Sequence, residues 1–165
     1  MSNQLQQIIQ KQKSQSEVED PDAIEEVLQL VGFIVGEEEF TVPILSIQEI
    51  IKPIEFTRVP HTPDYVLGVF NLRGTVIPLI DLRSKFGMNS ENQTSDTRYI
   101  VMKNDQEIAG FVIDRLTEAI RLNLRDIDPA PDTSMQEKSM IAGVGKQEDR
   151  ILTILKVDRL LERDF

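Results

Sequence analysis

The stretch Gly68–Leu82, which reads GVFNLRGTVIPLIDL, decides the fold expected for this chain of 165 residues. This stretch contains most of two apolar, partly β-branched arms, Val66–Leu72 and Thr75–Leu82, which Arg73-Gly74 separates. Such arms joined by a short turn with a glycine predict a β-hairpin. Gly74 can adopt the positive φ of a tight turn at little cost. The hairpin would present one charged side chain, Arg73, as a contact point for another macromolecule.

Further short apolar runs, separated by polar or proline-containing turns, predict a mainly β protein. The predicted strands outside the hairpin are Leu28–Val35, Phe40–Pro43, Tyr99–Met102, Ile108–Ile113, Leu116–Leu122, Ile141–Val144 and Ile151–Leu155. Short helices are predicted at Ser46–Ile51, Asp81–Gly87 and Val157–Arg163. Pro78 cannot donate to a strand ladder, so its strand is expected at a sheet edge or a bulge.

An internal duplication relates the two halves of the chain. Five segments of the first half have counterparts in the same order in the second: 36–42 and 104–110, 47–49 and 116–118, 60–62 and 131–133, 66–69 and 141–144, 76–80 and 151–155. The tip Leu72-Arg73-Gly74 corresponds to Gln147-Glu148-Asp149, an ordinary polar turn. This divergence within a repeat marks Arg73 as a residue that the fold itself does not require.

The duplication predicts two modules of about 60 to 70 residues, each with roughly five strands that close into a small barrel. A barrel of this size is marginal alone, so the two are expected to pack side by side on a shared apolar surface with a groove between them. The predicted division is 28–88 for the first barrel, 89–97 for a polar linker and 98–165 for the second. Residues 1–27 are glutamine-rich and then acidic, which predicts a flexible extension.

Composition excludes several classes of function. The net charge of −10 argues against a nucleic-acid partner, because such proteins normally carry a basic face. Cysteine is absent, which removes disulfides, thiolate chemistry and most zinc sites. No apolar run approaches the roughly 18 residues of a membrane span, and no secretory signal is recognisable at the N-terminus. We therefore expect a cytoplasmic protein without direct membrane insertion.

Signatures of catalysis are missing as well. His61 is the only histidine and lies between prolines, so a role in a surface loop is expected. The sequence contains no nucleophile elbow, Walker motif or dinucleotide fingerprint. The acidic residues have structural interpretations, such as Asp81 capping the following short helix. We expect neither an enzyme nor a cofactor or metal; a small enzyme using carboxylates in the groove remains an open alternative.

The chain resembles the CheW-type chemotaxis coupling proteins over nearly all of residues 28–165. The specific run is Gly68–Gly74 followed by Val76–Arg83, and Ile47–Ile50 and Asp128–Pro131 support it. The same run occurs in the regulatory domain of the kinase CheA and in CheV, but the length of this chain favours the stand-alone coupler. The N-terminal extension departs from the family, whose members usually start nearer to their first strand.

The resemblance implies two SH3-like five-stranded barrels and a non-catalytic adaptor. Such a protein links the cytoplasmic tip of chemoreceptors to the histidine kinase CheA and is recruited to membrane-associated receptor arrays, where other CheW-like domains are further candidate partners. An adaptor of the same twin-barrel type in a related non-flagellar kinase pathway is the alternative function.

The resemblance also implies roles for individual residues. Those implied in receptor binding are Arg73, Leu72, Ile108 and Ala109, and those implied in kinase binding or coupling are Ile47, Glu49 and Gly68. Structural interpretations stand beside these roles. Gly68 is equally well explained by close backbone packing, and Ile47 and Ile108 by burial in the core. Glu49 could simply pair with Arg73 or Lys52 at the surface.

Overall fold

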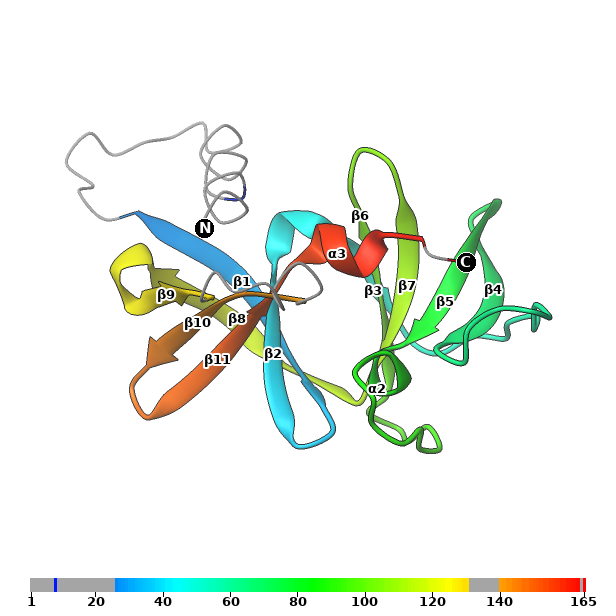
Figure 1. Cartoon of the computed structure of the whole chain (residues 1–165), viewed down its shortest axis with the longest axis horizontal. Coiled ribbons are helices and arrows are strands. Elements are labelled where there is room, and N and C mark those ends of the chain that lie inside the picture. The colour runs from blue at the N-terminus through cyan, green and yellow to red at the C-terminus, as the bar shows by residue number, and fades with distance from the viewer. Residues whose placement is uncertain (1–7, 9–25, 131–139, 164) are drawn as a thin grey trace.

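The computed structural model describes residues 26–130 and 140–163, together with residues 8 and 165. Within these ranges the chain is mainly β, and its strands form two sheets that lie side by side along the long axis of the molecule (Figure 1). The strands of the first sheet are β1 (Val27–Val35), β2 (Glu38–Pro43), β8 (Arg115–Asn123), β9 (Ile127–Pro129), β10 (Ile141–Gln147) and β11 (Arg150–Leu155). The strands of the second sheet are β3 (Ile47–Ile51), β4 (Val66–Leu72), β5 (Thr75–Asp81), β6 (Arg98–Lys103) and β7 (Ile108–Ile113).

The first sheet, barrel A below, has the order β8-β1-β2-β11-β10-β9, and the second, barrel B, has the order β3-β6-β7-β5-β4. Both contain one parallel contact, β2 with β11 and β5 with β7, among antiparallel neighbours. The mainly β fold predicted from the sequence is therefore confirmed. Strand β5 lies inside its sheet and not at an edge, but its pairing with β4 shifts register beside Pro78, between Val66 and Gly68, so of the two positions expected from Pro78 the structure bears out the bulge. Pro78 precedes the residues that pair with β7, which start at Leu79, so its missing N–H costs no ladder bond there.

The helical elements are short. Helix α2 (Leu82–Lys85) follows β5, and the Asp81 carboxylate caps it by accepting from the backbone N–H of Arg83, as predicted. Helix α3 (Val157–Leu161) is the last helix, and its Leu160 and Leu161 are buried as the sequence predicts. The helical turn expected over Ser46–Ile51 is wrong. A 3₁₀ turn at Ile44–Ser46, η1, precedes it, and Ile47–Ile51 pairs as strand β3 because its β-branched side chains suit a sheet. A second 3₁₀ turn, η2 (Leu124–Asp126), precedes β9.

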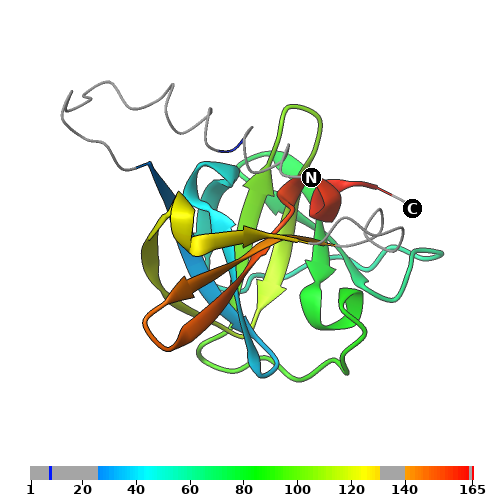
Figure 2. The same cartoon turned by 60° about the vertical axis from the view of Figure 1, so that its left-hand side comes forward.

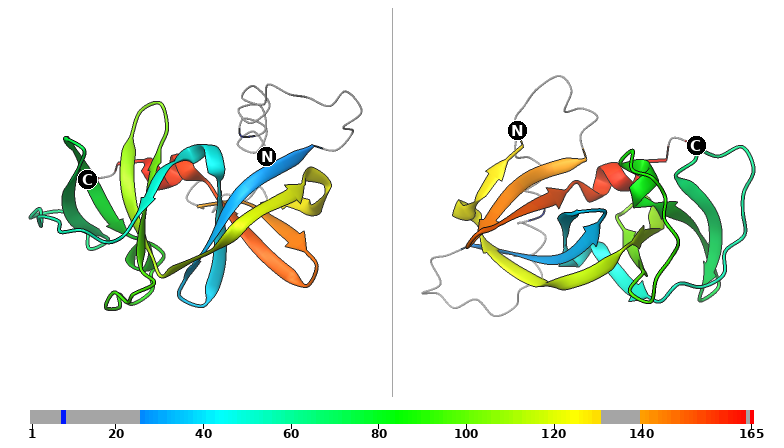
Figure 3. Two further views of the ribbon diagram at one scale, coloured as in Figure 1. Left: turned by 180° about the vertical axis from the view of Figure 1, so that it is seen from behind. Right: turned by 90° about the horizontal axis from the view of Figure 1, so that it is seen from below.

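The barrels are not contiguous in sequence, contrary to the predicted division into 28–88 and 98–165. The β1–β2 hairpin belongs to barrel A with strands of the second half, and the β6–β7 hairpin belongs to barrel B with strands of the first half. The chain crosses twice, through η1 between β2 and β3 and through Asp114 between β7 and β8. Figure 3, seen from behind, shows β1 beside β8 and β3 beside β6. The two repeats have thus exchanged their first hairpins.

Strand register makes the two barrels equivalent residue by residue. The β4–β5 and β10–β11 hairpins both shift register at the same place, between Val66 and Gly68 and between Ile141 and Gly143. Both end in a two-residue turn. The parallel pairs Leu79–Gly110 and Ile154–Thr41 extend the equivalence to the exchanged hairpins. By this register Gly110 is equivalent to Thr41, so the predicted match of 36–42 with 104–110 is wrong by one residue. The counterpart predicted at 131–133 lies outside the described residues.

A shared core joins the barrels, as expected for two marginal modules. The largest buried cluster takes side chains from both sheets and from α3: Phe33, Val35, Phe40, Val42, Ile80, Leu82, Ile100, Met102, Ala109, Phe111, Ile113, Leu155, Val157, Leu160 and Leu161. Each barrel also has a smaller cluster of its own. Burial of apolar side chains contributes roughly 1.5–3 kcal/mol each before the entropy cost of folding. The cluster therefore makes the two barrels one stable unit.

Polar contacts reinforce this joint at the second crossing. Nε and Nη2 of Arg83 donate to the two carboxylate oxygens of Asp114, at 2.9 and 2.6 Å. The backbone N–H of Gly36, in the β1–β2 turn, donates to the same carboxylate at 2.9 Å. Hydrogen bonding to Asp114 raises the pKa of the Arg83 guanidinium. Helix α2 of barrel B is thereby tied to the crossing point and to a turn of barrel A.

Candidate functional site

The tip of the β4–β5 hairpin is a two-residue turn whose residues both have positive φ, 52° for Arg73 and 88° for Gly74. The side chain of Asn71 stabilises the turn by accepting from the backbone N–H of Gly74 at 2.9 Å. An ideal Cβ on Gly74 would meet no atom within 4 Å, so the tip faces open space. The hairpin predicted from the sequence is confirmed, and it presents the Arg73 side chain 80% exposed.

Arg73 has one described carboxylate partner, Glu49 on β3. Nη2 of Arg73 donates to Oε2 of Glu49 at 3.3 Å, and the Glu49 side chain is 23% exposed. Strands β3 and β4 stand at opposite ends of the sheet order, so this contact brings the two ends of barrel B together. An exposed pair of this kind contributes roughly 0–1 kcal/mol to stability. The arginine therefore stays available to a stronger partner.

Apolar side chains lie beside the tip. Leu72 and Ile108 are half-buried, and both pack against the cluster that fills barrel B: Phe70, Ile77, Leu79, Tyr99 and Val101. Val76, on the second arm of the hairpin, is 63% exposed. A guanidinium next to branched aliphatic side chains can bind a carboxylate or carbonyl while its neighbours cover apolar surface. Of the residues singled out from the sequence, the structure thus pairs Arg73 with Glu49 and packs Leu72 and Ile108 against one cluster.

The other predicted site residues lie elsewhere. Ala109 is 3% exposed and belongs to the core shared by the barrels, so its side chain does not reach a surface groove. Alternation along β7 explains this burial, because Ala109 and Ile108 point to opposite faces. Ile47 is half-buried, pairs with Met102 and packs against the same shared core. The set inferred from the resemblance therefore divides between the hairpin tip and the core.

Gly68 lies under a crossing segment of backbone. Thr57 and Val69 exchange two backbone hydrogen bonds, of 2.7 and 2.8 Å, which bring this segment onto β4. A Cβ on Gly68 would lie 2.1 Å from the carbonyl oxygen of Thr57. Real Cβ atoms do not approach backbone this closely, so the position requires glycine. The interpretation of Gly68 by close backbone packing is the one that this contact supports.

A charged cluster on barrel A escaped the sequence analysis. Nη2 of Arg150 donates to Oε2 of Glu39 at 2.7 Å, and Nη1 donates to Glu118. Burial is the largest influence on Glu39 and opposes its ionisation, but hydrogen bonds from Arg150 and Thr117 and the charges of Arg150 and Arg115 together hold the pKa of this carboxyl below its ordinary value. By register, Arg150 is the counterpart of Thr75 on the other hairpin. Extending the comparison of the two tips by one residue would have found it.

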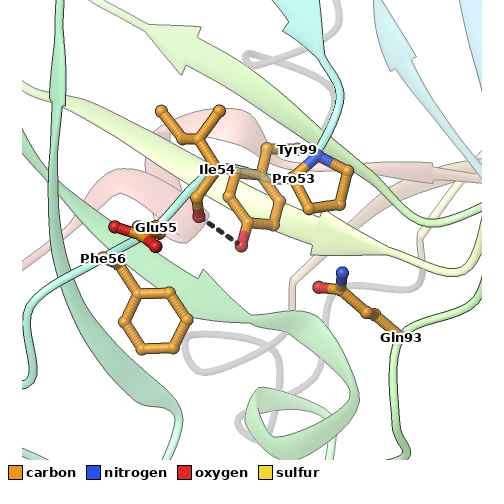
Figure 4. A pocket seen from close by; sticks show the side chains of 6 residues that line it. All are labelled: Pro53, Ile54, Glu55, Phe56, Gln93 and Tyr99. Carbon is orange, nitrogen blue, oxygen red and sulfur yellow. Dashed lines mark hydrogen bonds between the residues drawn. The ribbon is translucent and has the colours of Figure 1, made fainter.

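The described surface of barrel B also has an open hollow, formed by Pro53, Ile54, Glu55, Phe56, Gln93 and Tyr99 (Figure 4). The Tyr99 hydroxyl donates to the carbonyl oxygen of Ile54 at 3.3 Å, which holds the 53–56 segment beside β6. Ile54 and Phe56 are 41% and 42% exposed, and the hollow lacks the converging carboxylates that the enzyme alternative requires. Within the described ranges, His, Asp and Glu side chains do not gather in a group that could hold a metal ion.

Comparisons with known proteins agree with this architecture. The family model described as the CheW-like domain matches residues 29–165. The chain is 56% identical to the chemotaxis protein CheW of Helicobacter pylori over 165 residues, which cover all of both chains. It is 34% identical to the chemotaxis protein CheW of Klebsiella aerogenes over 133 residues, 80% of each chain.

A solved structure has the same fold. The crystal structure of the scaffolding protein TtCheW from Thermoanaerobacter tengcongensis matches with a TM-score of 0.72 at 30% identity, over 78% of this chain and 88% of the other. The full-length match to the Helicobacter pylori relative includes the N-terminal extension, so that feature is not peculiar to this chain. No helix in the described residues is long and apolar enough to cross a membrane. The chain belongs to the CheW-like family of chemotaxis scaffold proteins.

Proposed function

We propose that this protein is a non-catalytic adaptor that couples chemoreceptors to a CheA-like histidine kinase and helps to assemble their signalling array. Family membership supports a role in chemotaxis, and the relatives are named as chemotaxis and scaffolding proteins. Recruitment to membrane-associated arrays is part of the same proposal. The hairpin tip supports the receptor contact, because it displays a cation that the fold itself uses only weakly.

The observation that carries the proposal is the 80% exposure of Arg73 on a turn whose backbone is held by Asn71. A helical receptor segment would lay its apolar side chains beside Leu72 and Ile108, and its carboxylates or free carbonyls would accept from the guanidinium. The contact with Glu49 would keep the arginine oriented until a receptor replaces it. Ala109 contributes to this surface only by supporting its neighbour Ile108 from the core.

The kinase would bind on the terminal strands of barrel B, next to the proposed receptor contact. Glu49 lies on β3 and Gly68 on β4, the two terminal strands of the sheet order. Ile47 and Gly68 would act through the shape of these strands rather than by direct contact, since the first packs into the core and the second lies under Thr57. Movement of a receptor would then reach the kinase by rigid-body displacement of the joined barrels.

Reversal of charge at the tip tests the receptor contact. Binding of the purified full-length protein to a soluble fragment of a receptor cytoplasmic tip is measured for wild type and Arg73→Glu. We expect the substitution to weaken binding about tenfold or more, which corresponds to about 1.4 kcal/mol. The matched control is Glu148→Arg, a charge reversal at the equivalent tip of barrel A, and it should leave receptor binding unchanged.

Binding of the same variants to a CheA-like kinase separates the two contacts. Arg73→Glu should retain kinase binding, because Arg73 is not itself part of the proposed kinase surface and its exposed pair with Glu49 contributes little. Undiminished receptor binding by Arg73→Glu, with the protein folded, would remove Arg73 from the proposed site. Equal loss from Glu148→Arg, which changes the net charge in the opposite direction, would show that receptor binding is not specific to the tip of barrel B.

A further inference from the structure

The N-terminal extension begins next to one end of barrel A. Val27, the first residue of β1, pairs with Asn123 of β8. The backbone N–H of Leu124 in η2 donates to the carbonyl oxygen of Glu26 at 3.1 Å. The chain therefore leaves the barrel beside η2. A chain can extend about 3.3–3.6 Å per residue, so the segment before Glu26 can readily reach back over this end of the barrel.

In the structure, one residue of the extension, Ile8, contacts barrel A. Ile8 is helical, half-buried and packed against the cluster that fills barrel A. Leu124 packs against the same cluster from η2. The members of this cluster are Leu28, Leu30, Ile120, Leu122, Ile127, Ala142, Leu152 and Ile154. Two aliphatic side chains, one from the extension and one from η2, thus pack against the cluster of barrel A. In Figure 2 the sheet of barrel A is turned forward.

Among the described residues, the equivalent end of barrel B is more exposed. Asp128 pairs with Val144 as Thr57 pairs with Val69, so register makes Ile127 the counterpart of Phe56. Ile127 is 8% exposed, whereas Phe56 is 42% exposed at the rim of the hollow in Figure 4. The difference between covered and open ends coincides with the presence of Ile8 on barrel A.

We propose that the N-terminal segment around Ile8 is an intramolecular cap that occupies the η2 end of barrel A. The segment has the composition for this role, because Leu5, Ile8 and Ile9 recur at the spacing of one helical face among glutamines. While docked, it withholds from other proteins the barrel end whose counterpart on barrel B is open. The occupant is thus a segment of this chain, and a second protein reaches this end only by displacing it.

The absence of cysteine from the sequence allows a direct test. A nitroxide spin label is attached to the full-length variant Lys11→Cys, and methyl NMR intensities are compared with those of the reduced label. Docking predicts strong loss of the Leu122 and Leu152 methyl signals of barrel A. The methyl signals of Leu79, at the position in barrel B equivalent to Ile154, should keep their intensity.

A second substitution in the labelled chain separates docking from mere proximity. Ile8→Asp should restore the Leu122 and Leu152 signals, because a charged side chain is not tolerated against an apolar cluster. The control Ile54→Asp, at the open end of barrel B, should leave the signal loss as it is. Full intensity in the first experiment, or signal loss that persists with Ile8→Asp, would overturn the cap.

Discussion

The tips of the β4–β5 and β10–β11 hairpins have the same backbone and different surroundings. Arg73 and its counterpart Glu148 occupy the same turn position with φ of 52° and 55°. Each hairpin also exposes a β-branched residue at the same position of its second strand: Val76 is 63% exposed and Ile151 is 67% exposed. The turn therefore keeps the same backbone conformation with arginine or with glutamate at this position.

The arginine near the hairpin tip has different carboxylate partners in the two barrels. In barrel A, Arg150 lies between Glu39 and Glu118, and its own side chain is 37% exposed. In barrel B the position equivalent to Glu39 is Ile108, which leaves Glu49, the counterpart of Glu118, as the carboxylate in contact with Arg73. One barrel uses its arginine within the fold and the other displays it. This comparison supports the proposed contact of Arg73 with a receptor.

The largest expected effect is a difference in stability between glycine substitutions at the base and at the tip of the β4–β5 hairpin. Gly68→Ala places a methyl group 2.1 Å from the Thr57 carbonyl and should destabilise the protein by about 2–4 kcal/mol. Gly74→Ala meets open space and suffers only the cost of a positive φ, about 1 kcal/mol. Urea unfolding of both variants measures the difference. Equal losses would mean that the Thr57 segment yields, and Gly68 would lose its structural explanation.

The two arginines should differ in what they contribute to stability. Arg150→Ala leaves Glu39, with a side chain 17% exposed, without its guanidinium and should cost about 1–2 kcal/mol. Arg73→Ala should change the free energy of unfolding by less than about 0.5 kcal/mol, because its pair with Glu49 is exposed. Thermal unfolding of the two variants beside wild type checks this. A cost for Arg73 as large as that for Arg150 would contradict the comparison drawn above.

The smallest effect concerns acid stability. The folded protein holds the pKa of Glu39 below its ordinary value of 4.5, so ionised Glu39 stabilises the fold above about pH 4.5. That contribution disappears as the pH falls through the lowered pKa. Glu39→Gln should therefore be less stable than wild type at pH 7 and should lose less further stability between pH 4.5 and acid, as measured by urea unfolding at each pH. Glu148→Gln is the control, and identical pH profiles for all three proteins would disprove the role of Glu39.

Much of the local structure could be predicted from the sequence because it depends on neighbouring residues. Alternation and turn residues located the β4–β5 hairpin, its two-residue tip and the cap of α2 at Asp81. Comparison within the duplication singled out Arg73, whose exposure the structure bears out. The contact between Arg73 and Glu49 was one of the open interpretations. The Arg150 cluster was missed, since its three residues come from three separate strands.

The sequence by itself determined most of the strands, though not β3 and β9, as well as where each hairpin turns and that the chain contains two related modules. Only the tertiary structure decided which hairpin completes which barrel. A period of two in hydrophobicity specifies the face that a strand buries, but not the strand beside it. Because the repeats are alike, β1–β2 and β6–β7 carry patterns that suit either barrel, and the short crossings at η1 and Asp114 select the exchanged arrangement. The same exchange puts Ala109 in the shared core and packs Ile108, with Leu72, against the cluster of barrel B.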